Sequence, residues 1–167
     1  ADQAILAFQH ALKRDPNFAE AQAGISEAWF TMAAFGWKPP EPAYAEAESA
    51  AKEALKINPR VSDAHRMLAN LYSMREARLD LAESHYRQAI DYEPSNVMAL
   101  SWLAMEYAYQ GRFKEAMNEI SKARDLDPFS PLVVFYYGGI KYLSGDCLEA
   151  EIWAEKAIVD MKSRLAL

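Results

Sequence analysis

The sequence has little cysteine and no long hydrophobic run. Its single cysteine, Cys147, cannot form a disulfide within the chain, and an isolated thiol is typical of a reducing compartment, so we expect a cytoplasmic location. The longest apolar stretch, residues 131–140, has ten residues, whereas a membrane-spanning helix needs about 20. These two scarcities predict a protein without internal disulfides and without a membrane span.

Basic residues are also in deficit. The chain has 18 Lys and Arg against 24 Asp and Glu, which gives a net charge of −6. Because the phosphate backbone of a nucleic acid would repel such a surface, we expect no direct nucleic-acid contact by these residues. Hydrophobic residues make up 51% of the chain, enough to bury a continuous core, so the composition excludes a disordered segment.

Residue patterns that carry chemistry are scarce as well. The histidines, His10, His65 and His85, lie on different expected helices and are not at metal-ligand spacing in the sequence, although His65 lies beside the expected groove. Acidic pairs such as Glu46 and Glu48 are two residues apart, so on a helix they face different directions. We therefore predict no catalytic residue, no metal site and no cofactor, and a chain that is not an enzyme.

What the sequence does contain is a repeated helical pattern. An alanine is followed four residues later by a second side chain, large in most copies, and three residues after that by another alanine. The copies are Ala4/Phe8/Ala11, Ala47/Ala51/Ala54, Ala82/Tyr86/Ala89, Ala116/Ile120/Ala123 and Ala150/Ala154/Ala157. Their closing alanines are 43, 35, 34 and 34 residues apart, so the period is 34 with one insertion. These intervals place the side chains on one helical face, where alanine allows close helix packing.

A proline follows each of the first four copies at a constant offset. These prolines are Pro16, Pro59, Pro94 and Pro128. Since proline disfavours helix in the residue before it, the chain must turn at each one. Apolar residues between each proline and the next alanine set recur at helical intervals and predict a first helix, and Gly111 and Gly145 suit the turn inside the hairpin. The pattern predicts paired helices and no strands.

This layout resembles the tetratricopeptide repeat, whose pattern is aromatic-x2-Leu-Gly-x2-Tyr, then Ala-x3-Phe-x2-Ala, then Pro. The residues in register are clearest in one copy: Leu103, Ala104, Tyr107, Ala116, Ala123 and Pro128. The resemblance implies an all-α, right-handed α-solenoid of about nine helices, a lone helix plus four helix pairs. The expected single array over 1–167 comprises the second helix of a truncated repeat at 1–16 and repeats at 17–59, 60–94, 95–128 and 129–163.

The insertion lies in the first full repeat. Three prolines among residues 39–42 predict a stiff, exposed loop over 35–43 that carries Trp37. Two interpretations of Trp37 stay open, because it can fold back on Trp29 or Phe35 or contact a partner. The loop and the similar turns that follow resemble repeat arrays C-terminal to winged-helix domains of bacterial transcription regulators and to class III adenylate cyclase domains. This resemblance implies that the chain is part of a longer protein.

In the tetratricopeptide family the first helices line a concave groove that binds partners. Carried onto this sequence, the resemblance implies a partner-binding groove that includes Arg66, Asn70, Met74, Met98, Met105, Tyr109, Phe135 and Tyr142. The apolar part of this set suits a hydrophobic or helical peptide. The opposite end, with Glu20, Glu27 and Asp63, would suit a basic partner.

Three functions remain open at this point. The first is a regulatory or sensor module of a larger bacterial transcription regulator that binds a protein or peptide segment in its groove. The second is a cochaperone-like or secretion-chaperone-like adaptor. The third is the specificity arm of an enzyme such as an adenylate cyclase. In each case the partner is a protein, which can be another part of the same chain or a second copy in a homo-oligomer.

Overall fold

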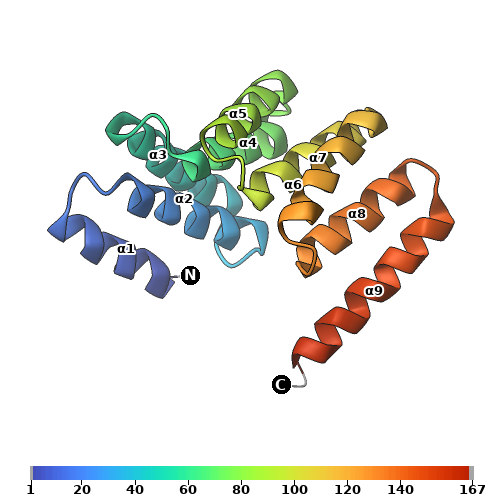
Figure 1. Cartoon of the computed structure of the whole chain (residues 1–167). Helices are drawn as coiled ribbons and strands as arrows, with labels where there is room; N and C mark the ends of the chain where they lie inside the picture. The colour runs from blue at the N-terminus through green and yellow to red at the C-terminus, as the bar shows by residue number, and fades with distance from the viewer. Residues whose placement is uncertain (1, 166–167) are drawn as a thin grey trace. The chain divides into compact units, whose positions relative to one another are not determined.

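The computed structural model describes the backbone of residues 2–165, and the side chains of residues 2–75, 77–156, 158 and 159. Over this described range the chain forms nine helices and no strand, as the sequence predicts. The helices labelled in Figure 1 are α1 (Asp2–Arg14), α2 (Ala19–Ala34), α3 (Pro40–Ile57), α4 (Ser62–Glu76), α5 (Leu79–Tyr92), α6 (Val97–Tyr109), α7 (Phe113–Leu126), α8 (Pro131–Leu143) and α9 (Cys147–Leu165).

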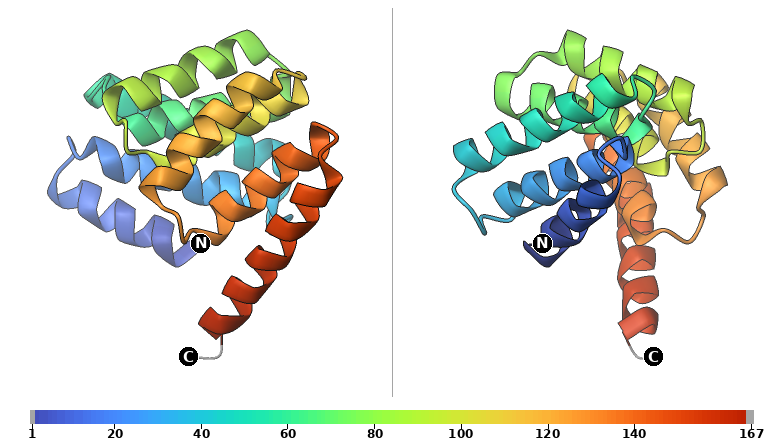
Figure 2. Two further views of the ribbon diagram at one scale, coloured as in Figure 1. Left: turned by 45° about the vertical axis from the view of Figure 1, so that its right-hand side comes forward. Right: turned by 90° about the vertical axis from the view of Figure 1, so that its left-hand side faces the viewer.

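The helices gather into two compact units, Ala1–Pro94 and Ser95–Leu167. In the first unit α2 pairs with α3 and α4 with α5, while α1 packs on α2. In the second unit α6 pairs with α7 and α8 with α9. Figure 2 shows α9 continuing beyond the end of α8, since α9 has 19 residues and α8 has 13. The assignment of these pairs to the repeats expected from the sequence stays a proposal.

The repeated alanines form the contact surface of the second helices. Ala47, Ala54, Ala89 and Ala123 have 0% of their surface exposed, so the alanine face is buried in the three middle copies, whereas Ala4 of the first copy and Ala154 of the last are exposed. Because alanine side chains are short, the paired first helix can approach closely enough for polar contacts across the pair. The Ser26 hydroxyl, for example, donates to the Ala47 carbonyl at 2.7 Å.

Each of the four hairpin turns contains a residue with positive φ. Gly111 has φ +74° and Gly145 has φ +88°, which confirms the turn role predicted for both, and Gly36 has φ +69°. The α4–α5 turn uses Ala77 at φ +51° instead. An L-residue with a Cβ is disfavoured in this left-handed region, so the α4–α5 turn carries a backbone cost that the other three avoid.

The extent of the predicted loop over residues 35–43 is wrong. Helix α3 begins at Pro40, with Pro39 at its N-cap. Prolines are tolerated in the first turn because the N–H that they lack has no helical partner there. In the shorter connection, the Trp37 ring stacks on Phe35 with 5.4 Å between the ring centroids, and Trp37 remains 62% exposed. Of the two interpretations of Trp37, the local contact with Phe35 is therefore present.

In the last hairpin, a glycine permits close packing of the two helices. A Cβ at Gly138 of α8 would lie 3.3 Å from the Trp153 Cβ of α9. The two helices are also joined by the rings of Tyr137 and Trp153, whose centroids are 4.5 Å apart. The Arg124 guanidinium of α7 lies over the Tyr137 ring, 5.1 Å from its centroid. Tyr137 thus connects α8 to both α7 and α9.

Candidate partner-binding surface

Of the candidate groove residues, Arg66, Asn70 and Met74 lie on α4 in the first unit. Arg66 is only 3% exposed. Its Nη2 donates to Glu27 Oε2 of α2 at 3.0 Å, and its Nε donates to Asp63 Oδ1 at 3.1 Å. The Arg66 charge is therefore paired with two carboxylates of the same unit, and the side chain connects α4 to α2.

The next candidate along α4 is also committed to an internal contact. Asn70 is 1% exposed, and its Oδ1 accepts a hydrogen bond from the Tyr86 hydroxyl of α5 at 2.5 Å. Met74, one turn further on, is 52% exposed. Among the three candidates of the first unit, Met74 is the one that a partner could contact without rearrangement of the hairpin.

The candidates of the second unit include three exposed aromatic side chains. Tyr109 at the end of α6 is 71% exposed, and Phe135 and Tyr142 of α8 are 64% and 66% exposed. Met98 is half-buried and Met105 is 8% exposed. Tyr109, Phe135 and Tyr142 are named here the aromatic surface.

A layer of less exposed rings supports the aromatic surface. The Tyr136 ring centroid lies 5.7 Å from that of Phe135 and 5.5 Å from that of Trp102. Burial, and after it the neighbouring Tyr109, raises the pKa of Tyr136 to about 12, so this phenol stays neutral. Large exposed apolar side chains above a layer of packed rings are typical of surfaces that bind other proteins.

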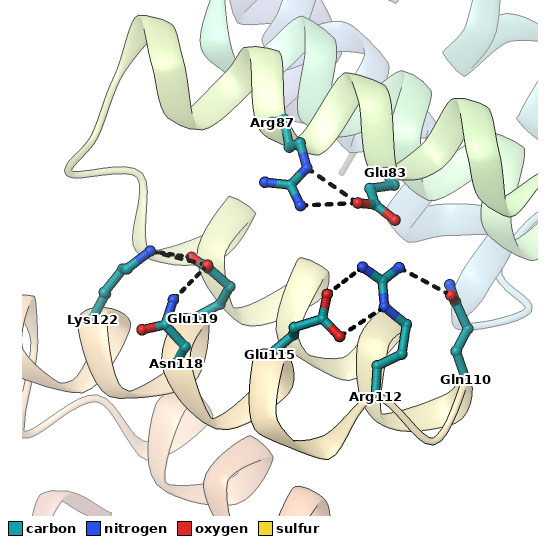
Figure 3. Close-up of polar contacts among 8 residues, drawn as sticks. All are labelled: Glu83, Arg87, Gln110, Arg112, Glu115, Asn118, Glu119 and Lys122. Atoms are coloured by element: carbon teal, nitrogen blue, oxygen red, sulfur yellow. Dashed lines mark hydrogen bonds and ion pairs between the residues drawn. The ribbon is translucent and has the colours of Figure 1, made fainter.

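The second helices carry charged pairs instead. Figure 3 shows Arg87 of α5 bonded to Glu83, at 3.0 Å from Nη2 to Oε1. On α7, Lys122 contacts Glu119 at 2.9 Å. An exposed pair three or four residues apart on one helix is worth about 0.3–0.5 kcal/mol, and of the two pairs here Glu119 is itself buried. They maintain a polar surface on α5 and α7, in contrast to the exposed rings of α6 and α8.

A contact that the sequence spacing did not reveal joins two histidines of the first unit. His65 Nδ1 of α4 lies 2.9 Å from His85 Nδ1 of α5. His65 Nε2 lies 2.9 Å from the Pro59 carbonyl oxygen, which can only accept, so Nε2 carries the proton. In the neutral pair His85 Nδ1–H therefore donates to His65 Nδ1. In the sequence, His65 follows the buried Ala64 and His85 precedes the buried Tyr86. This adjacency is the signal from which burial of the two histidines could have been predicted.

The surroundings of the two histidines favour their neutral forms. Burial lowers the pKa of His85 to about 4, with the neighbouring His65 charge as the second cause. Burial also lowers the pKa of His65, and the hydrogen bond to Pro59 opposes this shift. The pair thus acts as an internal polar contact of the α4–α5 hairpin at neutral pH.

Two other features are absent from the described part of the chain. No three or more His, Cys, Asp or Glu side chains there lie close enough together to hold a metal ion. Likewise, none of the helices described is both long and apolar enough to span a membrane.

Comparisons with known sequences agree with the repeat pattern. Residues 72–131 match the sequence model of a family described as Tetratricopeptide repeat. Over 88 residues, or 51% of the chain, the sequence is 36% identical to a TPR repeat-containing protein of Pseudomonas aeruginosa. The matched segment spans 15% of the length of that protein.

Solved structures share the fold over nearly the whole chain. PilW, described as a widely conserved type IV pilus biogenesis factor, has a TM-score of 0.75 at 20% identity, covering 96% of this chain and 70% of PilW. MamA has a TM-score of 0.66 at 19% identity, covering 99% of this chain and 91% of MamA. YrrB, described as a TPR protein with an unusual peptide-binding site, has a TM-score of 0.62 at 19% identity, with 98% and 79% covered. The chain therefore has the fold of the tetratricopeptide solenoids.

Proposed function

We propose that this chain is a protein-interaction module that binds a peptide or protein segment through the first helices of its repeats. The observation that carries the proposal is the aromatic surface, where Tyr109, Phe135 and Tyr142 are each more than 60% exposed. Aromatic side chains are over-represented among the residues that dominate binding energies at interfaces. The description of YrrB as a peptide-binding protein of the same fold supports a partner of this kind.

The test starts from a peptide selected on the intact protein from a random display library. Its affinity is then measured for the wild type and for Phe135→Ala and Tyr109→Ala. If the aromatic surface anchors the peptide, each truncation should cost about 2 kcal/mol, roughly a thirtyfold loss of affinity. Unchanged affinity in both variants, with helical content retained, would refute the proposal for this surface.

A charge-based mode is the competing candidate within the same function. Glu20, Glu27 and Asp63 are exposed on the first unit, and the Arg66 charge is already taken up by two of them. A basic partner held there would bind more weakly as salt increases, whereas an apolar anchor depends little on salt. Glu20→Gln, measured at low and high salt beside Phe135→Ala, separates the two modes and leaves the Arg66 contacts intact.

More specific roles stay predictions from the sequence. The role of regulatory arm of a bacterial transcription regulator or adenylate cyclase is predicted from the resemblance of the segment around residues 35–43. An adaptor role in secretion or chaperoning is compatible with the same fold. The description of PilW as a pilus biogenesis factor favours an adaptor over the regulatory arm. We also propose that the chain itself performs no catalysis, contacts no nucleic acid and resides in the cytoplasm, with homo-oligomerisation as an outcome to be measured.

A further inference from the structure

The first unit contains a hollow between α1 and α3, with α2 as its floor. Both α1 and α3 pack on α2, and within the described residues they do not pack on each other. Figure 1 shows α2 between these two helices. The volume of the hollow is about 340 Å3, at the lower end of the range of about 300–1,000 Å3 for ligand pockets. Its apolar walls are Leu12 of α1, Ile25 and Trp29 of α2, and Ala50 of α3. We name this feature the α1–α3 hollow.

The next hairpin of the same unit fills the equivalent place with an imidazole ring. Helix α2 aligns with α4 at an offset of 43 residues, so Trp29 corresponds to Tyr72. Helix α3 aligns with α5 at an offset of 35 residues, so Ala50 corresponds to His85. The centroid of the His85 ring lies 5.4 Å from that of Tyr72. A planar group with N–H donors therefore fits beside the ring of the first helix, and in the α2–α3 hairpin Ala50 leaves that volume open.

The rim of the α1–α3 hollow carries charges that the next hairpin lacks. Glu46 and Glu53 line the hollow and lie on the same face of α3 as Ala50, since the three residues are four and three positions apart. The corresponding residues of α5 are Leu81 and Gln88. No described residue that lines the hollow is basic. The first hairpin thus lacks an imidazole and has two additional carboxylates at the same place, which favours a planar cation as occupant.

The carboxylates are accessible to another molecule. Glu46 is exposed and Glu53 is half-buried. Glu53 Oε2 accepts a hydrogen bond from Lys56 Nζ at 2.8 Å, but the Lys56 side chain is 72% exposed. Exposed pairs within one helix contribute little, so an incoming cation can replace Lys56 at Glu53. The hollow can therefore be entered without rearrangement of the three helices.

We propose that the α1–α3 hollow receives an arginine side chain from a basic segment of a partner protein, with the guanidinium beside the Trp29 ring and between the carboxylates of Glu46 and Glu53. The planar shape follows from the imidazole of the next hairpin, and the charge follows from the two carboxylates. Arginine suits the site better than lysine, because a guanidinium stacks on aromatic rings and bonds carboxylates through a planar fork.

The other residues of the hollow favour a protein as the source of the cation. Leu12 and Ile25 offer an apolar surface to the aliphatic stem of the arginine. Gln9, Gln22 and Ser49 add neutral donors and acceptors that suit a polypeptide backbone. This second contact site lies in the first unit and goes beyond the proposed function, which concerns the aromatic surface of the second.

The test titrates the whole chain with a blocked peptide of about five residues that has one central arginine among glycine and alanine. Matched peptides carry citrulline, a neutral group of the same shape, or lysine at the centre. The indole N–H resonance of Trp29, assigned with Trp29→Phe, reports binding in amide NMR spectra. We expect a saturable shift, with the arginine peptide bound at least about tenfold more tightly than the citrulline peptide and more tightly than the lysine peptide. Added salt should weaken this binding.

Two variants of the hollow and one matched control locate the arginine. Ala50→His restores the residue type of His85 and should reduce the affinity at least about tenfold. Glu46→Gln/Glu53→Gln keeps the shape of the hollow and should cause a similar loss. Glu20→Gln removes one negative charge from the same unit outside the hollow and should leave the affinity unchanged. Thermal unfolding shows whether each variant remains folded.

Several results would overturn the proposal. They are the absence of a saturable Trp29 shift, equal affinity for the arginine and citrulline peptides, and affinity unchanged in both hollow variants. A loss with Glu20→Gln in place of the hollow variants would move the arginine to the acidic end of the first helices. Agmatine, a free guanidinium on a short chain, is titrated in parallel, and tighter binding of agmatine than of the arginine peptide would refute a protein as the source. The proposed function is judged separately, by the display-selected peptide and its response to Phe135→Ala.

Discussion

Arg66 of α4 and Phe135 of α8 occupy equivalent positions of their first helices, yet Arg66 is 3% exposed and Phe135 is 64% exposed. The difference lies in what the neighbouring elements supply. Helix α2 provides Glu27, which with Asp63 pairs the Arg66 guanidinium, whereas the Phe135 ring meets the tilted Tyr136 ring at 5.7 Å between centroids and stays mostly exposed. The position in the repeat thus determines the direction of a side chain, and its neighbours determine whether it is available to a partner.

The same contrast extends to other polar side chains of the first unit. Asn70 is bonded to Tyr86 and His65 to His85, each across the α4–α5 hairpin. The second unit instead exposes Tyr109 and Tyr142 on its first helices. We infer that polar contacts in the first unit serve stability and that the exposed rings of the second unit serve binding. The predictions below can contradict that division.

The largest effect should come from the histidine pair. Since burial depresses the folded-state pKa of His85 to about 4 while the unfolded value is about 6.5, stability is fully present above pH 6.5 and declines as the pH falls toward 4. The wild type should lose at most about 3 kcal/mol of its free energy of unfolding, and solvent screening of the partly exposed His85 makes the loss smaller. Urea unfolding between pH 7 and pH 4 measures it.

The matched variant for this prediction is His65→Leu/His85→Phe, which removes both titrations and keeps apolar volume at both positions. Its free energy of unfolding should decline less steeply than that of the wild type over the same pH range. Parallel curves would assign the acid sensitivity to carboxylates and would remove the histidine pair from the stabilising contacts of the first unit.

The fold was largely predictable because its determinants are local and periodic. Buried alanines such as Ala54 and Ala123 and the turn glycine Gly111 follow from the 34-residue period. The start of α3 was not predicted, because prolines that break a helix interior are compatible with its first turn, and Pro40 lies there.

The state of the candidate residues was less predictable. That Arg66 is buried depends on Glu27, which is 39 residues away in the sequence, and no periodicity indicates such a pairing. The small residue Ala154, at the position of Ile120, lines an apolar hollow between α8 and α9. The sequence could not indicate this hollow, because a missing side chain indicates a cavity only once the surrounding helices are placed.

An intermediate effect should separate Arg66 from Phe135. Arg66→Ala removes two charge-assisted hydrogen bonds and the packing of a buried side chain, so it should lower the free energy of unfolding by about 2 kcal/mol. Phe135→Ala removes a mostly exposed ring and should change it by less than about 0.5 kcal/mol. Chemical denaturation of both variants at pH 7 tests the pair. Equal losses would show that exposure does not distinguish stability from binding at this repeat position.

The smallest effect concerns the hairpin turns of the two units. Ala77 in the α4–α5 turn has φ +51°, where Gly111 in the α6–α7 turn has φ +74°. A left-handed conformation costs an L-residue about 1–2 kcal/mol, and glycine at the same position costs more entropy on folding. Ala77→Gly should therefore stabilise the protein by about 0.5 kcal/mol net, and Gly111→Ala should destabilise it by about 1 kcal/mol.

Nothing lies within 4 Å of a Cβ built at Gly111, so that variant tests backbone conformation without a steric clash. Thermal and urea unfolding measure both changes. If Ala77→Gly destabilises the protein instead, local contacts must offset the cost of the left-handed conformation at Ala77. The α4–α5 turn would then be stabilised differently from the glycine turn of the second unit.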